Sequence, residues 1–308
     1  MVDPPVRIVS LLSSATEILF AIGVGEQVVG IGHECDWPPE ATTRPRVTRS
    51  WIDSQLPSDE IDRVVRARLA AGQPLYEVDA SRLAELSPDL IITQAQCDVC
   101  AVRYEDVVSL VERTPALSKT QVVALQPATL AEIFDDIERI GAAVGAVKAA
   151  ADFVDSLRVR INRITTLTSS LHHPRVICIE WVEPLMLAAN WTPTLIELAG
   201  GESGLTVANQ HSTYTDWQAI VAYDPEVVLI SPCGFDLERS HREAQRLLAL
   251  PGWRDMRAVR DGRVYLVDGN AYLNRSGPRI VDSLEIVAHL LHPTVCPNVW
   301  PDGWQRFA

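Results

Sequence analysis

Tryptophan side chains are prominent among the residues that could contact a ligand. Four of the eight tryptophans lie in short loops that directly follow apolar runs: Trp37, Trp51, Trp181 and Trp191. An indole ring offers a large, rigid contact surface with one hydrogen-bond donor, which suits a broad, flat, largely apolar ligand edged with amides. A small sugar or amino acid would instead require clustered charge. The tryptophans therefore indicate a large flat ligand, with ordinary packing as the alternative for each one taken alone.

Two histidines and a cysteine pair could contribute chemistry. His33 and His211 are typical of polar contacts in a ligand site, and a neutral imidazole also suits the metal at the centre of a bound macrocycle. We expect the axial contact from His211 rather than His33, because His211 follows a glycine-rich segment. Cys97 and Cys100 form a CxxC motif, which occurs in redox pairs, in half of a zinc site and in loops whose thiols only touch a ligand. A second CxxC and an HxxxH motif are both missing, so a zinc site is not favoured.

The elements that must position these residues occur twice along the chain. Apolar runs at residues 7–12 and 175–180 each lead into a helix that ends in glycine, and the strand at 87–92 recurs at 224–230. In parallel sheets, ligands meet the loops beyond the carboxyl ends of the strands. The candidate ligand contacts in such loops are Ser14, His33, Trp37, Trp51, Gln96, Cys97, Trp181, Asn190, Trp191, His211, Tyr214, Cys233, Tyr272, Asn274 and Arg275.

A long amphipathic segment separates the two copies. From Thr129 to about Ser170 the apolar residues recur at spacings of three and four, which predicts one helix roughly 60 Å long. The predicted fold is therefore α/β, with Rossmann-like lobes at 1–127 and 173–308 joined by a single backbone helix at 128–172. A cleft between two such lobes is a preferred place for a small ligand. The alternative for the helix is the arm of a coiled-coil dimer.

Composition narrows the class of protein. The 308 residues are 47% hydrophobic and 22% charged, which is enough for two ordinary cores. A net charge of −13 argues against a nucleic-acid or anionic-membrane partner. Apolar runs are too short to insert in a membrane, and the chain enters its first strand without a basic, then apolar, leader. We therefore expect a cytoplasmic location, with the six cysteines as reduced thiols.

Several segments resemble one family. Residues 7–17, 29–39, 87–92 and 276–279 are similar to the cobalamin-binding, helical-backbone (class III) substrate-binding proteins of ABC importers, here without a signal peptide. The resemblance implies a bilobed fold that holds cobalamin or a related corrinoid between the lobes. It also implies aromatic ligand contacts from Trp51 and Trp181, and a polar clamp at Asn274 and Arg275. One exposed glutamate per lobe, Glu105 and Glu238, would dock on a permease.

The expected function is that of a corrinoid carrier, scavenger or transport-associated binding protein. Its expected partners are an ABC permease or a cobalamin-using protein, and we expect no catalytic residues, because the sequence contains no GxSxG, P-loop or dinucleotide-binding motif. One alternative is an enzyme that acts on a corrinoid through Cys97 or Cys100, with His33 or His211 as base. Another is a ferric siderophore or heme-binding protein. A further charged segment at 53–74 is expected to be helical.

Overall fold

The computed structural model describes residues 5–95, 99 and 101–308, and these residues form two compact units. The first unit comprises the described residues of Met1–Leu56, Arg63–Pro127 and Ala131–Asp155. The second unit comprises Pro57–Asp62, Ala128–Leu130 and Ser156–Ala308. Each unit is built around its own sheet and is described separately below.

The first unit contains a four-stranded parallel sheet in the order β2-β1-β5-β6. Its strands are β1 (Ile8–Ser10), β2 (Val28–Ile31), β5 (Leu90–Gln94) and β6 (Gln121–Leu125). The two inner strands, β1 and β5, are largely apolar because helices cover both faces of a parallel sheet. A separate antiparallel pair is formed by β3 (Thr48–Ser50) and β4 (Tyr76–Val78). The strand at 87–92 that the sequence predicts thus corresponds to β5, next to the first strand.

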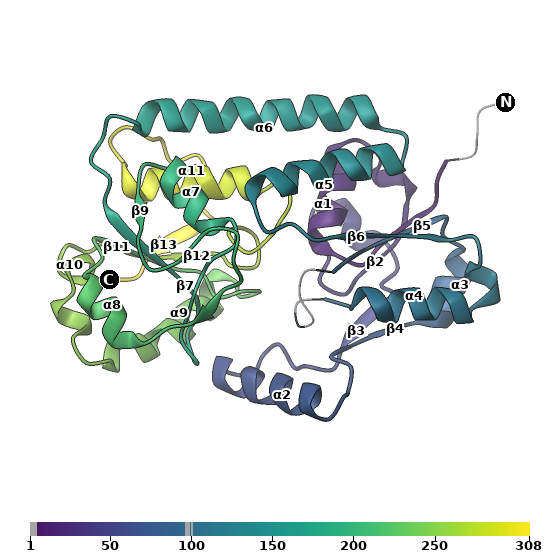
Figure 1. Cartoon of the computed structure of the whole chain (residues 1–308), viewed down its shortest axis with the longest axis horizontal. Helices are drawn as coiled ribbons and strands as arrows, with labels where there is room; N and C mark the ends of the chain where they lie inside the picture. Colours follow the sequence, from purple (N-terminus) through teal and green to yellow (C-terminus); the bar gives the residue numbers. More distant parts are fainter. Residues whose placement is uncertain (1–4, 96–98, 100) are drawn as a thin grey trace. The chain divides into compact units, whose positions relative to one another are not determined.

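Helices cover the two faces of this sheet. In Figure 1, α1 and α5 lie on one side of it and α3 and α4 on the other. Val9, Leu11, Leu83, Ile91 and Val107 are buried together in the core beneath α3 and α4. The helices of the first unit, with their bounds, are α1 (Ser13–Ala21), η1 (Gly25–Gln27), η2 (Pro39–Thr43), α3 (Ala80–Leu86), α4 (Tyr104–Arg113) and η3 (Pro115–Leu117).

The second unit contains a seven-stranded mixed sheet in the order β10-β8-β7-β11-β12-β13, with β9 also paired to β7. Its centre is parallel, and β8, β10 and β13 run antiparallel to their neighbours. The strands are β7 (Arg175–Trp181), β8 (Met186–Leu187), β9 (Glu202–Ser203), β10 (Thr213–Tyr214), β11 (Val227–Ile230), β12 (Val264–Val267) and β13 (Trp304–Arg306). The predicted repeat of strands is therefore present, as β7 and β11.

Helices again flank this sheet. Figure 1 shows α7 and α11 on one side and α8, α9 and α10 on the other. The core on the second side includes Ile177, Val228, Leu247 and Trp253. The helices are α7 (Thr192–Leu198), α8 (Trp217–Tyr223), α9 (Leu237–Ala244), η4 (Gln245–Ala249), η5 (Trp253–Asp255), α10 (Arg257–Arg260) and α11 (Ile280–Leu291).

The connecting segment forms two helices instead of the single helix that its spacing predicts. Helix α5 (Leu130–Ala143) and helix α6 (Val147–Thr168) are separated by a turn. Gly145 has φ 73° there, and the N–H of Ala146 donates to the carbonyl of Gly141 at 2.7 Å, as at a glycine-terminated helix. The apolar spacing of three and four continues through this turn, so periodicity alone could not detect it. Helix α6 is the connecting element, because it begins in the first unit and ends in the second.

The charged segment at 53–74 contains helix α2 (Ser58–Ala70), which confirms the predicted helix. Its first residues, through Asp62, group with the second unit, and the remainder groups with the first. Among the described residues, no helix combines the length and apolar character that crossing a bilayer requires.

Candidate ligand-binding site

In the first unit, the loop after β1 places a buried hydroxyl at the carboxyl end of the sheet. Ser14, near the start of α1, is 3% exposed, and its Oγ has no hydrogen-bond partner among the described residues. The neighbouring Ser13 hydroxyl instead donates to the carbonyl of Glu34 at 2.8 Å. Buried hydroxyls are normally paired, and leaving one unpaired costs about 1 to 3 kcal/mol. Ser14 is therefore suited to bond a polar group of a ligand.

His33 follows β2 and is held by Thr48. Its backbone N–H donates to Thr48 Oγ1 at 2.8 Å, and its Nδ1 lies 2.7 Å from the same oxygen. The imidazole also packs on Tyr76, with ring centroids 5.2 Å apart. Burial, with a smaller effect from the Arg46 guanidinium, lowers the pKa of His33 to about 4. The imidazole is therefore neutral near pH 7.

The second ring nitrogen of His33 has no partner within hydrogen-bond distance. Nε2 is shielded from solvent, and a carboxylate oxygen of Glu34 lies 3.9 Å away, which is too long for a hydrogen bond. A neutral imidazole with an unpaired nitrogen can bond a ligand amide or a metal. Because Nε2 is shielded, a ligand reaches it only when the neighbouring groups move.

Trp37 and Trp51 are exposed, unlike indoles that pack in a core. They are 46% and 45% exposed, respectively. The guanidinium carbons of Arg49 and Arg68 lie 4.4 and 5.7 Å from the centroid of the Trp51 ring. These cations stabilise the indole through its negative face and leave an aromatic surface with basic edges.

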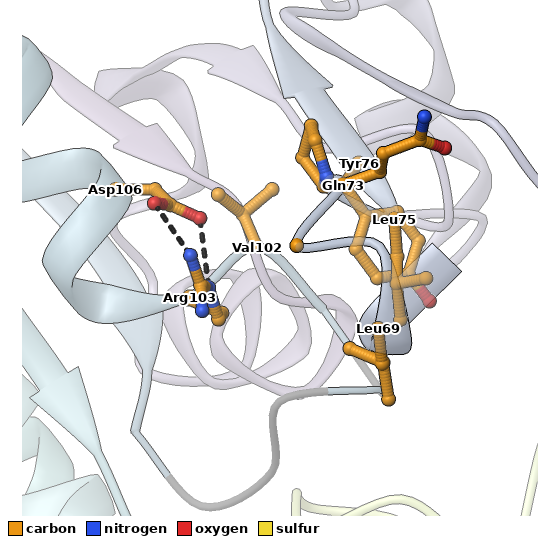
Figure 2. A pocket seen from close by; sticks show the side chains of 9 residues that line it. Leu69, Gln73, Leu75, Tyr76, Val102, Arg103 and Asp106 are labelled. Carbon is orange, nitrogen blue, oxygen red and sulfur yellow. Dashed lines mark hydrogen bonds and ion pairs between the residues drawn. The ribbon is translucent and has the colours of Figure 1, made fainter. Parts of the chain in front are cut away.

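A small pocket lies near Trp51, between the end of α2 and the start of α4 (Figure 2). Its volume is about 70 Å³, whereas pockets that bind drug-sized ligands have volumes of about 300 to 1,000 Å³. Arg103 and Asp106 at its edge pair with each other through two contacts of 3.0 Å. The other lining residues are Leu69, Gly72, Gln73, Pro74, Leu75, Tyr76 and Val102. This pocket cannot hold a macrocycle.

In the second unit, aromatic and cationic groups meet beyond the ends of β7 and β11. Trp181, the half-buried last residue of β7, packs edge-on against Phe235 with ring centroids 5.1 Å apart. The guanidinium of Arg239 lies 3.4 Å above the Phe235 ring. Cys233 is half-buried beside them, and its backbone N–H donates to the carbonyl of Glu180 at 3.1 Å. The structure thus brings Trp181 and Cys233 together.

Two further loops meet at this edge of the sheet. Asn190 exchanges backbone hydrogen bonds with Gln210 and Asn209, at 2.7 and 3.0 Å. It adopts φ 50°, a left-handed conformation that asparagine tolerates, and its Oδ1 is buried without a partner. Ser212 donates from Oγ to the Glu180 carboxylate, which ties the loop of His211 to the end of β7. His211 itself is exposed.

The remaining candidates in this unit differ in burial. Trp191 is 6% exposed, and its Nε1 donates to the carbonyl of Leu273 at 2.7 Å, so it packs inside the unit. Asn274 donates from Nδ2 to the carbonyl of Ser231 at 2.8 Å, and Arg275 is 8% exposed. Tyr272 is half-buried, and Tyr214 is 56% exposed.

Two features of the site are missing from the sequence-based candidates. Ser231, which directly follows β11, is fully buried, and its Oγ has no partner among the described residues. The sequence signal that could have identified Ser231 as a candidate is its position directly after an apolar run. Arg239 lies above the Phe235 ring from helix α9, and no sequence pattern connects these two residues.

The cysteine motif cannot be evaluated in the same way. Gln96, Cys97 and Cys100 lie outside the described residues. The cysteines within the described part of the chain are free: Cys35, Cys178, Cys233 and Cys296. Across residues 5–95, 99 and 101–308, no cluster of three or more His, Cys, Asp or Glu side chains is arranged to hold a metal ion.

Sequence comparisons agree over nearly the whole chain. The family profile described as "Periplasmic binding protein" matches residues 8–271. An uncharacterized ABC transporter substrate-binding lipoprotein of Bacillus subtilis (strain 168), YvrC, is 23% identical over 297 residues, which cover 94% of this chain and 81% of the relative. A vitamin B12-binding protein of Vibrio cholerae is 24% identical over 299 residues, covering 94% of this chain and 90% of that protein.

Solved structures show the same fold. The periplasmic heme-binding protein RhuT from Roseiflexus sp. RS-1 in apo form has a TM-score of 0.68 at 22% identity, with 94% of this chain and 99% of that chain covered. The periplasmic vitamin B12 binding protein BtuF of Vibrio cholerae has a TM-score of 0.64 at 21% identity, with 93% and 97% covered. These matches confirm the predicted two-lobe α/β, helical-backbone fold.

The predicted cytoplasmic location is wrong. The matching family is periplasmic by description, and the relatives include a substrate-binding lipoprotein of an ABC transporter. These findings indicate a location outside the cytoplasm. The prediction depended on the residues that open the sequence, and the similarity to this family over most of the chain outweighs it.

Proposed function

Because this chain belongs to the periplasmic binding protein family, we propose that the small molecule it binds is cobalamin or a related corrinoid. The chain is a substrate-binding protein of the kind that serves ABC importers, and it is not an enzyme. One observation carries the choice of ligand, namely the whole-length similarity to a vitamin B12-binding protein. The exposed indoles of Trp37 and Trp51 also favour a large flat ligand.

Each unit contributes groups that match the chemistry of a corrinoid. A corrinoid is a broad ring with amide side chains, so it needs apolar contact over its face and polar partners at its edge. We assign the face contacts to Trp51 and Trp181. We assign the edge contacts to the buried oxygens of Ser14, Asn190 and Ser231, which have no partner among the described residues. The polar clamp at Asn274 and Arg275 and the axial contact from His211 stay predictions.

The proposed partner is the permease of an ABC importer, on the outer side of the cytoplasmic membrane. Glu105 is exposed on α4, and the side chain of Glu238 on α9 is 84% exposed. One glutamate on each unit is thus accessible to a partner. Docking through these two side chains is a proposal based on family resemblance.

Heme is the second candidate ligand, and two observations favour it. The fold is shared with a heme-binding protein, and His33 is a neutral imidazole with an unpaired Nε2. A corrinoid carries amides at most positions around the edge of its ring, whereas heme carries two carboxylates there.

Parallel titrations with cyanocobalamin and with hemin distinguish the candidates. We expect cyanocobalamin to quench the tryptophan fluorescence saturably at one-to-one stoichiometry, and hemin to bind more weakly. Calorimetry with the same ligands supplies a readout that is independent of their absorbance. Saturable hemin binding with a shifted Soret band, together with no response to cyanocobalamin, would favour heme. No response to either ligand would refute both proposals.

A further inference from the structure

Helix α2 is attached to the second unit by polar contacts at its first turn. Ser58, the first residue of α2, is fully buried. Its backbone N–H and its Oγ both donate to one carboxylate oxygen of Glu243, at 3.3 and 2.7 Å. Glu243 belongs to α9 and is 9% exposed. This carboxylate therefore acts as an external cap for the start of α2.

An arginine and a tyrosine extend this contact. Arg246 in η4 pairs with Asp59 of α2 at 2.8 Å, and also with Glu183 at 2.7 Å. The hydroxyl of Tyr214 on β10 donates to Asp62 at 3.2 Å. Polar contacts at Ser58, Asp59 and Asp62 thus hold the start of α2. Their partners come from three different elements of the second unit, α9, η4 and β10.

The rest of α2 contributes little apolar packing. Its 13 residues include six charged side chains, and Ser58 and Val65 are its two buried residues. Leu69 near its end is 41% exposed. A helix start held by a few polar contacts, one of them a partly exposed ion pair, opens more readily than one that buries an apolar face, and salt weakens the ion pair.

We infer that the first turn of α2 is a reversible latch, which closes on Glu243, Arg246 and Tyr214 and opens as a local unit. Arg68 of the last turn of α2 groups with the first unit, where it lies over the Trp51 ring and donates to the carbonyl of Pro74, so the latch is confined to the start of the helix. This inference does not depend on which ligand the protein binds.

Hydrogen exchange followed by mass spectrometry on the full chain tests the latch. In the wild type, we expect amides within 57–70 to exchange at least tenfold faster than those within α6. Ser58→Ala should accelerate exchange at 57–70 by a further factor of about ten, which corresponds to about 1.4 kcal/mol. Tyr214→Phe, a surface change that removes one contact, should give a smaller acceleration. Sodium chloride at high concentration should accelerate the same peptides in the wild type.

Glu238→Gln is the matched control, because Glu238 lies on α9 but pairs with Arg242 of its own helix. It should leave exchange at 57–70 unchanged. Wild-type protection at 57–70 equal to that of α6 would overturn the inference, since the segment would then be a permanent part of the fold. Unchanged exchange in Ser58→Ala, in Tyr214→Phe and at high salt would overturn it as well. The salt measurement uses unaltered protein, so it is decisive even when a variant fails to fold.

Discussion

The pH dependence of unfolding gives the clearest test of the buried environment described for His33 in the first unit. The folded pKa of His33 is about 4, against an ordinary 6.5, because the imidazole is buried and lies near Arg46. A histidine with a lowered folded pKa stabilises the fold above the unfolded pKa, and this contribution is lost as the pH falls below 6.5. The full pKa shift corresponds to a loss of about 3.4 kcal/mol in the free energy of unfolding, which is complete below pH 4. About 1.3 kcal/mol of this loss occurs between pH 7.5 and 5.5.

Asp136 on α5 acts in the opposite direction over the same range. Burial raises the pKa of this carboxyl from 3.8 to about 6, against the opposing effect of Arg139. Acidification from pH 7.5 to 5.5 protonates Asp136 in the folded state first, and this contributes about 0.8 kcal/mol of stability. Wild-type stability over this range therefore conceals two larger effects of opposite sign.

The assay is urea unfolding at both pH values for the wild type, His33→Asn and Asp136→Asn. Asparagine retains a polar group that can reach Thr48 and does not titrate. We expect His33→Asn to lose about 1.3 kcal/mol less than the wild type on acidification, and Asp136→Asn to lose about 0.8 kcal/mol more. If His33→Asn and the wild type respond to pH by the same amount, the imidazole is not desolvated as described, and the reasoning is refuted.

Three further predictions concern affinity and packing. Trp51→Ala and Trp181→Ala should each weaken cyanocobalamin binding by about 5- to 150-fold, or on the order of 1 to 3 kcal/mol, in fluorescence titrations, and unchanged affinity in both would remove them from the site. Arg160→Met should lower the free energy of unfolding by about 3 kcal/mol in urea, because Asp282 and Glu285, which Arg160 contacts, would lose their cation; a loss below 1 kcal/mol would contradict this. Gly269→Ala should cost about 1 to 3 kcal/mol in thermal unfolding, since a Cβ there would lie 2.1 Å from the Pro232 carbonyl, and wild-type stability would show that the backbone yields freely.

The sequence predicted the elements that depend on local pattern. The apolar runs at 7–12 and 175–180 form β1 and β7, because buried parallel strands require continuous apolar side chains. The charged segment at 53–74 forms α2. The break between α5 and α6 was missed because Gly145 interrupts the backbone while leaving the apolar spacing intact.

The positions of strand ends were predictable from the sequence, but the burial of the candidate residues was not, and their contact with a ligand stays a prediction. The apolar runs that end in strands could be located, so Trp181 was placed at the end of β7 and Ser14 shortly after β1. Burial could not be derived, because it depends on which distant segments cover each loop. Trp191 shows this, since its Nε1 bonds to Leu273, which lies 82 residues further along the chain. The docking of Ser58 on Glu243, 185 residues apart, is another contact that no local pattern encodes.

The two units share one feature that links their folds to ligand binding. In each, a buried serine whose hydroxyl has no partner among the described residues follows a strand with neighbours on both sides: Ser14 in the first turn of α1, after β1, and Ser231 directly beyond β11. A buried unpaired hydroxyl costs about 1 to 3 kcal/mol, so a fold selected for stability alone would replace it with alanine. A ligand that forms hydrogen bonds with these oxygens removes this unfavourable free energy, and it does so in the complex only. The proposed contacts of these hydroxyls would thus convert part of the folding stability into affinity for a ligand with polar edges.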